Sequence, residues 1–533
     1  MSTTTTADSA APGAAPSEPK LRRAVGVWGS FAWGYADVGA DVYVAVGLVA
    51  AYAQGALPLA FLAAGLLYVI VGFAYTELAS AYPVAGGSQY YAMRGLGDFW
   101  GFFSGWALLL DFTIDISLFG LSTAGYLNYF LRGPWPWVNN PIPLAGETLV
   151  LISVLVYLNI RGIREASWIN EVFAAIDMVL ETTLLLYGFA LAFDPVLLHT
   201  QMTTQLPTAH NLFYGISVAI VSYIGLESIS QVAQETIRPA TVIPRTSVTL
   251  ILTVLVYALG FSLLGIGTIG WQGLKAASLD PIAAIAEHLP LIGPFMAPIT
   301  AALAATLIFA STNTGILGSS RITWSMSHFD LLPRWFHEVH PRFNTPMRTI
   351  LVFSGLAVLQ LIAATIVALL QPAVAGEANP ALDTLANMYA FGALSGYILV
   401  MIGLVRLRLI DPQTPRPWKV PLNLRLRRHG HTVELPLLVI LGILGNFAIL
   451  LTVVATHAIG RIAGPVWVLI GIYIYHRHRK QSGLPVWGSK KRDWVTEQMR
   501  VLEEAEEWEA LRTYRAALAR HEVEERHHVE DAR

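Results

Sequence analysis

The chain of 533 residues contains no cysteine, which excludes disulfide bonds, thiolate metal sites and cysteine nucleophiles. Charged residues are scarce as well: they make up 13% of the chain, against about 25% in a soluble domain. Their near balance, a net charge of −2, gives no bulk attraction to nucleic acid, so no nucleic-acid partner is expected. The N-terminus lacks the apolar core of a signal peptide and is rich in Ser, Thr, Ala and Pro. We therefore expect residues 1–24 to be a disordered tail.

Hydrophobic residues are abundant, at 54% of the chain, and gather in runs of about 20 residues, long enough to cross a bilayer of roughly 30 Å. Strands of a membrane β-barrel would be about 10 residues long and alternate in polarity, and the sequence lacks that pattern. It therefore predicts an all-α polytopic membrane protein embedded in a lipid bilayer. Twelve transmembrane helices are expected, with cores at residues 26–51, 57–79, 100–130, 147–160, 170–193, 211–233, 246–270, 291–320, 347–370, 384–405, 435–456 and 460–475.

The basic residues of the connecting loops predict the orientation of these helices. With the N-terminus inside, nineteen Lys and Arg residues fall in the cytosolic segments before the C-terminal tail, and the outer loops hold three: Arg132, Lys275 and Arg461. Loops rich in Lys and Arg stay on the cytosolic side. Both termini are therefore expected in the cytosol, and the plasma membrane is the default location.

Residues 476–533 form a charged tail after the last apolar run. Six apolar residues recur in it at roughly helical spacing, namely Val495, Met499, Leu502, Leu511, Tyr514 and Leu518. The spacing predicts a cytosolic amphipathic helix that lies on the membrane surface, packs on another subunit or is solvated. The tail histidines lack a ligand pattern, so neither a metal nor another fixed cofactor is predicted. The oligomeric state is not determined by the sequence.

Seven carboxylic acids lie well inside the hydrophobic segments, away from their ends, and no lysine or arginine lies there with them: Asp37, Asp41, Asp111, Asp115, Asp177, Glu181 and Glu227. A charged side chain at the centre of a membrane costs about 2.5–3.5 kcal/mol on insertion scales. Such residues must face a protein interior or a wet cavity. Without basic partners, they are most simply interpreted as ligands for a moving cation, whether proton, metal ion or amine.

Two of the predicted helices contain glycines beside polar residues in mid-span. The first has two glycines and two aspartates between Gly34 and Asp41, and the sixth has Gly225 between Ser222 and Glu227. Interrupted helices at corresponding positions of two halves are typical of transporters built from inverted repeats. The free backbone groups at such a break can bind substrate and ion. Small residues that allow close helix packing are the alternative explanation for the glycines.

Short motifs along residues 25–475 resemble those of the amino acid–polyamine–organocation (APC) transporters. They are Tyr75-Thr76-Glu77-Leu78-Ala79, Pro83 to Ser88, Leu158 to Gly162, Gly225-Leu226-Glu227 with Glu235-Thr236 and Pro239, Ser319-Ser320-Arg321 with Leu332-Pro333, Thr345-Pro346, and Ala390-Phe391-Gly392. The resemblance implies a LeuT-type fold of two five-helix inverted repeats, about residues 25–193 and 211–405, with two extra helices at 435–475. It also implies breaks in helices 1 and 6 around a central site and alternating access.

Two positions depart from the pattern of amino-acid permeases. The stretch that usually holds a substrate carboxylate on backbone N–H groups is here Gly39-Ala40-Asp41. Because an ionised Asp41 would repel a carboxylate, Asp41 points away, is protonated, or the substrate has no carboxylate there. Asp177 occupies the place of a lysine on helix 5, which suggests a mobile Na⁺ or H⁺ instead of a fixed cation. Asp177 and Glu181 lie four residues apart, and so do Asp111 and Asp115, hence on one helix face each.

The chain also resembles potassium importers of the Kup/KimA type in part. The matching positions are Asp37, Asp111 with Phe112, Glu227 and Tyr389, although Phe112 lacks the hydroxyl expected there. Oxygen ligands suit a hard cation. The number of full charges is nevertheless high for K⁺.

These observations predict a secondary transporter, not an enzyme, for an amino acid or related amine, coupled to H⁺ or Na⁺. The expected substrate contacts are Asp37, Gly39, Ala40, Asp41, Asp111, Phe112, Asp115, Tyr223, Gly225, Glu227 and Tyr389. The expected coupling-ion site is Asp177, Glu181, Thr312 and Asn313. One alternative is a K⁺:H⁺ symporter with Asp37, Asp111, Glu227 and Tyr389 as ligands, and another is a membrane sensor that has lost transport.

Overall fold

The computed structural model describes residue 23 and residues 25–531 except 85, 163–166, 232, 234, 344, 372–375, 429–430 and 458. Its first half consists of α1 (Val27–Ala53), α2 (Leu57–Ala81), α3 (Ser88–Leu96), α4 (Asp98–Leu131), α5 (Pro141–Arg161), α6 (Ser167–Leu191) and α7 (Pro195–Thr204). The second half consists of α8 (Ala209–Ala219), α9 (Glu227–Gln231), α10 (Pro239–Thr268), α11 (Gly270–Ala276), α12 (Pro281–Glu287), α13 (Gly293–His328), α14 (Met347–Leu370) and α15 (Pro380–Ile410). Two strands, β1 (Asn423–Arg428) and β2 (His431–Pro436), then precede α16 (Leu437–Thr456), α17 (Gly460–Gln481), α18 (Trp494–Glu504) and α19 (Trp508–Asp531).

The predicted all-α polytopic membrane fold is confirmed. In the described parts of the chain, ten helical segments are long and apolar enough to cross a membrane, and one of them, Val27–Ala81, spans 55 residues and contains both α1 and α2. A 3₁₀ turn at Gln54–Ala56 separates these two helices, with Gln54 at φ 48°. The twelfth expected span coincides with α17, which is not among the apolar segments, so the count of twelve remains a prediction.

Proline begins several of these helices, where its missing N–H would have no intrahelical partner. Pro141, Pro195, Pro239, Pro281 and Pro380 each open a helix in this way. Side-chain caps reinforce some of the starts: Asp194 accepts hydrogen bonds from two backbone N–H groups of α7, and Asn379 does the same for α15.

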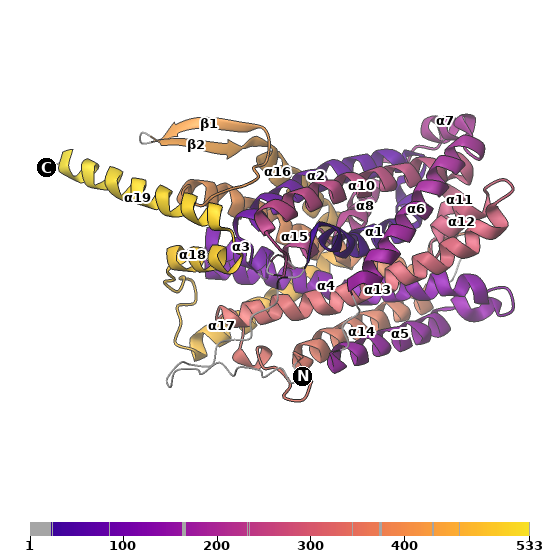
Figure 1. Ribbon diagram of the computed structural model, residues 1–533. Helices are drawn as coiled ribbons and strands as arrows, with labels where there is room; N and C mark the ends of the chain where they lie inside the picture. Colours follow the sequence, from indigo (N-terminus) through magenta and orange to yellow (C-terminus); the bar gives the residue numbers. More distant parts are fainter. Residues whose placement is uncertain are drawn as a thin grey trace, which may run out of the picture.

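The first helix lies at the centre of the bundle, and the prediction that it is broken is wrong. α1 runs without interruption from Val27 to Ala53 and is buried along almost all of that length (Figure 1). Gly39 does not open the helix. Its small size instead lets the ring of Tyr35 pack within 2.9 Å of the place where a Cβ would stand. Ser311 and Thr314 of the neighbouring helix α13 bind the α1 carboxylate of Asp37.

Two charged pairs within the family-like motifs hold the bundle together. Glu77 at the end of α2 accepts a hydrogen bond of 2.8 Å from Arg408 Nε on α15, and both side chains are buried. Glu235 accepts one of 2.9 Å from Arg321 on α13. Removing one partner of a buried pair typically costs about 3–5 kcal/mol, so the pairing of Glu77 with Arg408 has a structural role in the bundle.

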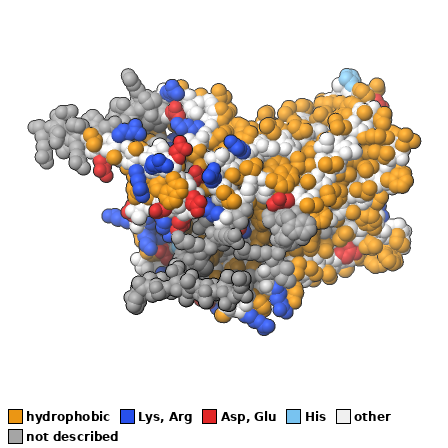
Figure 2. All heavy atoms as spheres, in the orientation of Figure 1, with side chains coloured by type: hydrophobic (Ala, Val, Ile, Leu, Met, Phe, Trp, Pro, Cys, Tyr) orange, Lys and Arg blue, Asp and Glu red, His pale blue; other side chains and the backbone are white. Residues whose placement is uncertain are grey.

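On the face that Figure 2 shows, charged side chains gather at the end of the molecule where β1, β2, α18 and α19 lie, and hydrophobic side chains cover most of the rest of that face. The antiparallel pair β1–β2 was not expected from the sequence, in which β1 is rich in arginine. The predicted amphipathic tail helix is two helices, α18 and α19, which meet at a turn where Glu506 has φ 55°. Residues 1–22, the greater part of the predicted N-terminal tail, lie outside the described residues.

Candidate functional site

The break in the sixth transmembrane segment is present as predicted. α8 passes into a 3₁₀ turn at Ile220–Tyr223, Ile224 is extended (φ −84°, ψ 156°), and Gly225 has φ 106° before α9 begins at Glu227. A φ of this sign suits glycine, which has no Cβ. A Cβ at Gly225 would also stand 2.8 Å from Oδ2 of Asp37. The break and the α1 aspartate therefore face each other directly.

Asp37 and Glu227 are bound by hydroxyl groups. Oδ1 of Asp37 accepts a hydrogen bond from Thr314 and a long one, 3.5 Å, from Ser311, both on α13. Oε2 of Glu227 accepts one of 2.7 Å from the hydroxyl of Tyr397 on α15. Since hydroxyls are neutral donors, these contacts orient the carboxylates without supplying a countercharge.

Asp111 and Asp115 of α4 form the facing wall, close to glycines of neighbouring helices. A Cβ at Gly315 of α13 would lie 3.0 Å from the Cβ of Asp115, and one at Gly392 of α15 would lie 3.2 Å from that of Asp111. Asp41 experiences the charges of Asp37, Asp111, Asp115 and Glu227. These five carboxylates, which we call the central acids, therefore form one electrostatic cluster. Their exposed fractions are 3% or less.

The central acids have no basic partner within the residues that the structure describes. Both carboxylate oxygens of Asp111, and one oxygen each of Asp41, Asp115 and Glu227, are buried there without a hydrogen-bond partner. A buried carboxylate without a partner is expensive, so the cluster is suited to bind a cation or cationic group. No three His, Asp or Glu residues of the described chain are arranged to hold a metal ion.

Asp177 and Glu181 of α6 form a second acidic site, bound by two tyrosines of α1. The hydroxyl of Tyr35 lies 2.8 Å from Asp177 Oδ2 and 2.5 Å from Glu181 Oε2, and the hydroxyl of Tyr43 lies 2.7 Å from Asp177 Oδ1. All four side chains are buried. The other oxygen of Glu181 lacks a partner among the described residues. Thus the two predicted carboxylates lie together, bridged by one hydroxyl.

The remaining predicted site residues lie apart from these clusters or only line them. Thr312 donates to Ile308 of its own helix, and Asn313 accepts from Asn159 of α5, so their hydrogen bonds do not reach Asp177. Tyr223 faces α2, where its hydroxyl donates to the carbonyl of Phe61. The other predicted contacts are buried: Ala40 in α1, Phe112 against Gly318, and Tyr389 beside Phe119.

Four hydroxyl residues that bind the predicted acids were not identified as site residues from the sequence: Tyr43, Ser311, Thr314 and Tyr397. Tyr35 and Tyr43 are separated by about two helical turns of α1, a spacing that places both on the side facing α6. That spacing could have indicated from the sequence that both tyrosines face the same neighbouring helix. Nothing in the sequence pairs Tyr397 with Glu227, because 170 residues separate them.

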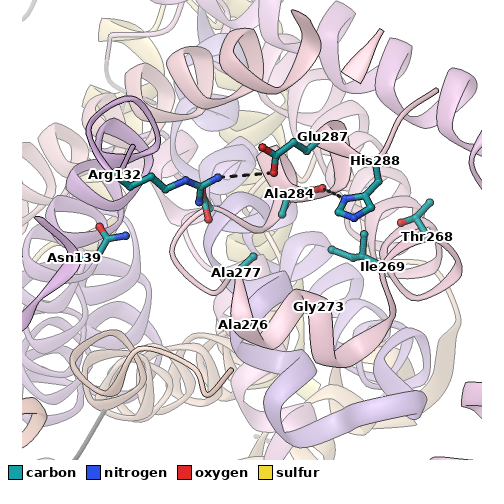
Figure 3. A pocket seen from close by; sticks show the side chains of 11 residues that line it. Arg132, Asn139, Thr268, Ile269, Gly273, Ala276, Ala277, Ala284, Glu287 and His288 are labelled. Carbon is teal, nitrogen blue, oxygen red and sulfur yellow. Dashed lines mark hydrogen bonds and ion pairs between the residues drawn. The ribbon is translucent and has the colours of Figure 1, made fainter. Parts of the chain in front are cut away.

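A separate cavity of about 530 Å³ lies at the opposite end of the molecule from α18 (Figure 3). Arg132 forms an ion pair of 2.7 Å with Asp280, and Glu287 lies 3.8 Å from the same guanidinium. Burial raises the pKa of Asp280 to about 6, although Arg132 opposes the shift. These opposite charges bind each other, whereas the central acids have no such partner.

A polytopic helical membrane protein with a broken helix beside a buried polar site belongs to the class of secondary transporters. Residues 25–475 match the family model described as amino acid permease. The chain therefore belongs to the amino acid permease family, and it is a transporter and not an enzyme.

Three curated relatives illustrate the range of this similarity. The branched-chain amino acid permease BcaP of Bacillus subtilis is 25% identical over 88% of this chain and 95% of its own length. The methylthioribose transporter of the same species is 26% identical over 72% of this chain and 80% of its own length. The vacuolar cationic amino acid transporter 4 of Arabidopsis thaliana is 28% identical over 60% of this chain and 55% of its own length. These comparisons favour amino acid transport and give no support to the potassium-importer alternative.

Proposed function

We propose that this protein carries a basic amino acid across the plasma membrane by alternating access, driven by protons. The observation that carries the proton coupling is the pair Asp177 and Glu181, which share the hydroxyl of Tyr35. Two ionised carboxylates so close repel each other in a medium of low dielectric, and a single proton relieves the repulsion. The unpartnered oxygen of Glu181 is the place for that proton. Na⁺ would need several further oxygen ligands, whereas a proton needs one.

The preference for a basic substrate rests on the central acids. Five carboxylates without a basic partner in the described chain favour a substrate that carries positive charge. The α-ammonium and side-chain cation of a basic amino acid supply it, and the substrate carboxylate takes the free backbone groups at the Gly225 break. The names of several Arabidopsis relatives, cationic amino acid transporters, agree with this choice.

The cytosolic placement of both termini is part of the proposal. It is supported by the nineteen basic residues of the predicted inner segments against three in the outer loops. The end that carries α18 and α19 is then the cytosolic end, and the cavity at Arg132 and Asp280 opens to the outside.

Uptake by purified protein in liposomes tests the proposal. Labelled lysine, arginine and leucine are offered with a proton gradient, a Na⁺ gradient or neither, and a pH dye inside the vesicles records proton entry. We expect proton-driven uptake of the basic amino acids. Asp177→Asn should abolish gradient-driven accumulation while leaving exchange of labelled for unlabelled substrate, because the central acids are intact. Asp41→Gly should instead change the order of preference among the three solutes.

The matched control is Asp194→Asn, the same substitution at an exposed helix cap, where asparagine also serves as a cap. It should leave both accumulation and exchange unchanged. Accumulation that follows Na⁺ and ignores the proton gradient would refute the proton coupling. Identical behaviour of Asp177→Asn and Asp41→Gly would refute the division into a coupling site and a substrate site.

A further inference from the structure

The C-terminal tail is bonded to the transmembrane domain by buried charged groups. Asp98, at the first turn of α4, lies 3.0 Å from Arg479, accepts a hydrogen bond of 3.0 Å from the backbone N–H of Lys490, and pairs with Arg492. Its exposed fraction is 1%, and that of Arg479 is 0%. A carboxylate at a helix N-terminus is further stabilised by the helix dipole. Asp98 therefore fixes the tail at the point where it leaves α17.

The first tail helix, α18, continues this attachment along the end of the bundle (Figure 1). Gln498 is fully buried, donates to the carbonyl of Ala81 at the end of α2 and accepts from Arg94 of α3, both at 2.9 Å. Arg94 in turn forms an ion pair of 2.8 Å with Asp411, which follows α15. Val501 is buried as well, and Leu502 packs with Leu511 and Tyr514 of α19. A helix surrounded by solvent would have neither these hydrogen bonds nor a fully buried glutamine.

The tail connects the two halves of the membrane domain. In the first half it binds Asp98, Ala81 and Arg94, as described above. In the second half Lys490 forms a 2.9 Å ion pair with Asp330 after α13, and Glu507 accepts a 2.9 Å hydrogen bond from the N–H of Ala240 at the start of α10. A segment that is bonded to both halves resists any movement of one relative to the other.

A short chain of contacts also links the tail to the central acids through α3. Arg94, which binds Gln498, and Ser88 lie at opposite ends of α3. Ser88 is hydrogen-bonded to Tyr75 at 2.5 Å, and the ring of Tyr75 packs at 5.7 Å on that of Tyr397, the residue that donates to Glu227. α3 therefore lies between the tail and the Glu227 end of the site.

We propose that residues 484–507, which we call the tail latch, hold the cytosolic side of the transporter closed and must detach before substrate is released inward. Alternating access moves one half of the domain against the other, and the latch contacts span both. In this structure the central acids are enclosed, as the latched state requires. The inference depends on the cytosolic placement of the tail and not on the identity of substrate or coupling ion.

The latch is built to open under electrostatic control. Lys490 and Asp330 have side chains that are 48% and 22% exposed, so salt in the cytosol screens their attraction. The Lys490 hydrogen bond and charge, with Arg334 and Arg492, lower the pKa of Asp330 below its ordinary value although burial raises it. Asp330 thus remains ionised at neutral pH, and ionic strength rather than pH is the expected trigger.

The test uses a single reporter cysteine in a chain that otherwise has none. Ser325→Cys places it on α13 under α3, where Ser325 accepts a 2.5 Å hydrogen bond from Gln89 and is 1% exposed. A membrane-impermeant thiol reagent is added to the cytosolic face of inside-out vesicles, and the rate of labelling is measured. Adding Arg492→Ala should raise this rate roughly threefold or more, because the population of the unlatched state increases. Moderate salt should raise the rate of the unmodified tail in the same direction.

Arg512→Ala is the matched control, because Arg512 lies in α19 and donates to Trp508 of its own helix. It should leave the labelling rate unchanged. If Arg492→Ala does not fold, Lys490→Ala takes its place, because it removes the partly exposed ion pair with Asp330 and should also raise the labelling rate. Arg492→Lys should restore slow labelling. Equal rates for Arg492→Ala, Lys490→Ala and Arg512→Ala would overturn the proposal, and so would a rate independent of salt.

Discussion

Asp280 lies in the cavity beside Arg132, and its ionisation works against the folded state. Burial raises its pKa to about 6 from the ordinary 3.8, in spite of Arg132. Because the folded-state pKa is the higher one, the stability that the protonated side chain contributes is complete below about pH 4 and is lost as the pH rises through about 6. Two pKa units correspond to at most roughly 3 kcal/mol.

Asp280→Asn removes this titration. The difference in unfolding temperature between the unmodified protein and the variant, measured in detergent from about pH 5 to about pH 8, should shift in favour of the variant as pH rises. Glu377→Gln, at an exposed partner of Lys275, serves as a control that should show a smaller pH effect. A difference that stays constant with pH would contradict the raised pKa of Asp280.

The interrupted sixth segment, α8 to α9, depends on one glycine. Gly225→Ala would force a Cβ into a backbone with φ 106° and to within 2.8 Å of Asp37. Strain of this kind costs about 1–3 kcal/mol, and the clash would also displace the carboxylate that faces the break. We expect loss of most substrate uptake in liposomes together with a lower unfolding temperature.

Gly355→Ala makes the same substitution in the middle of α14, where no atom lies within 4 Å of the new Cβ. Helix propensity favours alanine there by up to about 1 kcal/mol, so stability should stay equal or rise and uptake should persist. Normal uptake in Gly225→Ala would mean that the break is not needed for transport.

The arrangement of the whole chain in the membrane is tested by cysteine labelling in intact cells. Gly133→Cys lies in an open loop after α4, and Val523→Cys lies on α19, where Val523 is 52% exposed. With both termini in the cytosol, an impermeant thiol reagent should label the first in intact cells and the second only after permeabilisation. The reverse pattern would invert the orientation, and with it the side on which the tail latch acts.

Much of the architecture was predictable because burial in a bilayer imposes simple rules. Apolar runs of sufficient length predict spans, and eleven of the twelve predicted cores coincide with helices that the hydropathy of the described residues also selects. Gly225 beside Glu227 predicted a break correctly. Gly39 beside Asp41 predicted one wrongly, because glycine serves two purposes in membrane helices: it opens the backbone at the first position and admits the Tyr35 ring at the second.

The site was predictable only in part. Unpaired acids in apolar segments stand out by their insertion cost, so the carboxylates of both clusters could be identified. Most of their partners could not, since serine, threonine and tyrosine cost little in a membrane helix and do not differ visibly from their neighbours. The two-turn spacing of Tyr35 and Tyr43 along α1 is the exception. Thr312 and Asn313 were predicted, whereas their neighbours Ser311 and Thr314 contact Asp37, because the rotation of α13 decides which hydroxyls face inward.

By itself, the sequence determined that this chain crosses a membrane repeatedly and that unpaired acids lie within it. These properties follow from the transfer of single residues between water and lipid, which does not depend on neighbours far along the chain. Only the tertiary structure decided which groups meet: Tyr35 with Asp177 and Glu181, Tyr397 with Glu227, and the tail with both halves of the domain. Such contacts depend on helix rotation and on packing between distant segments, for which no local pattern exists.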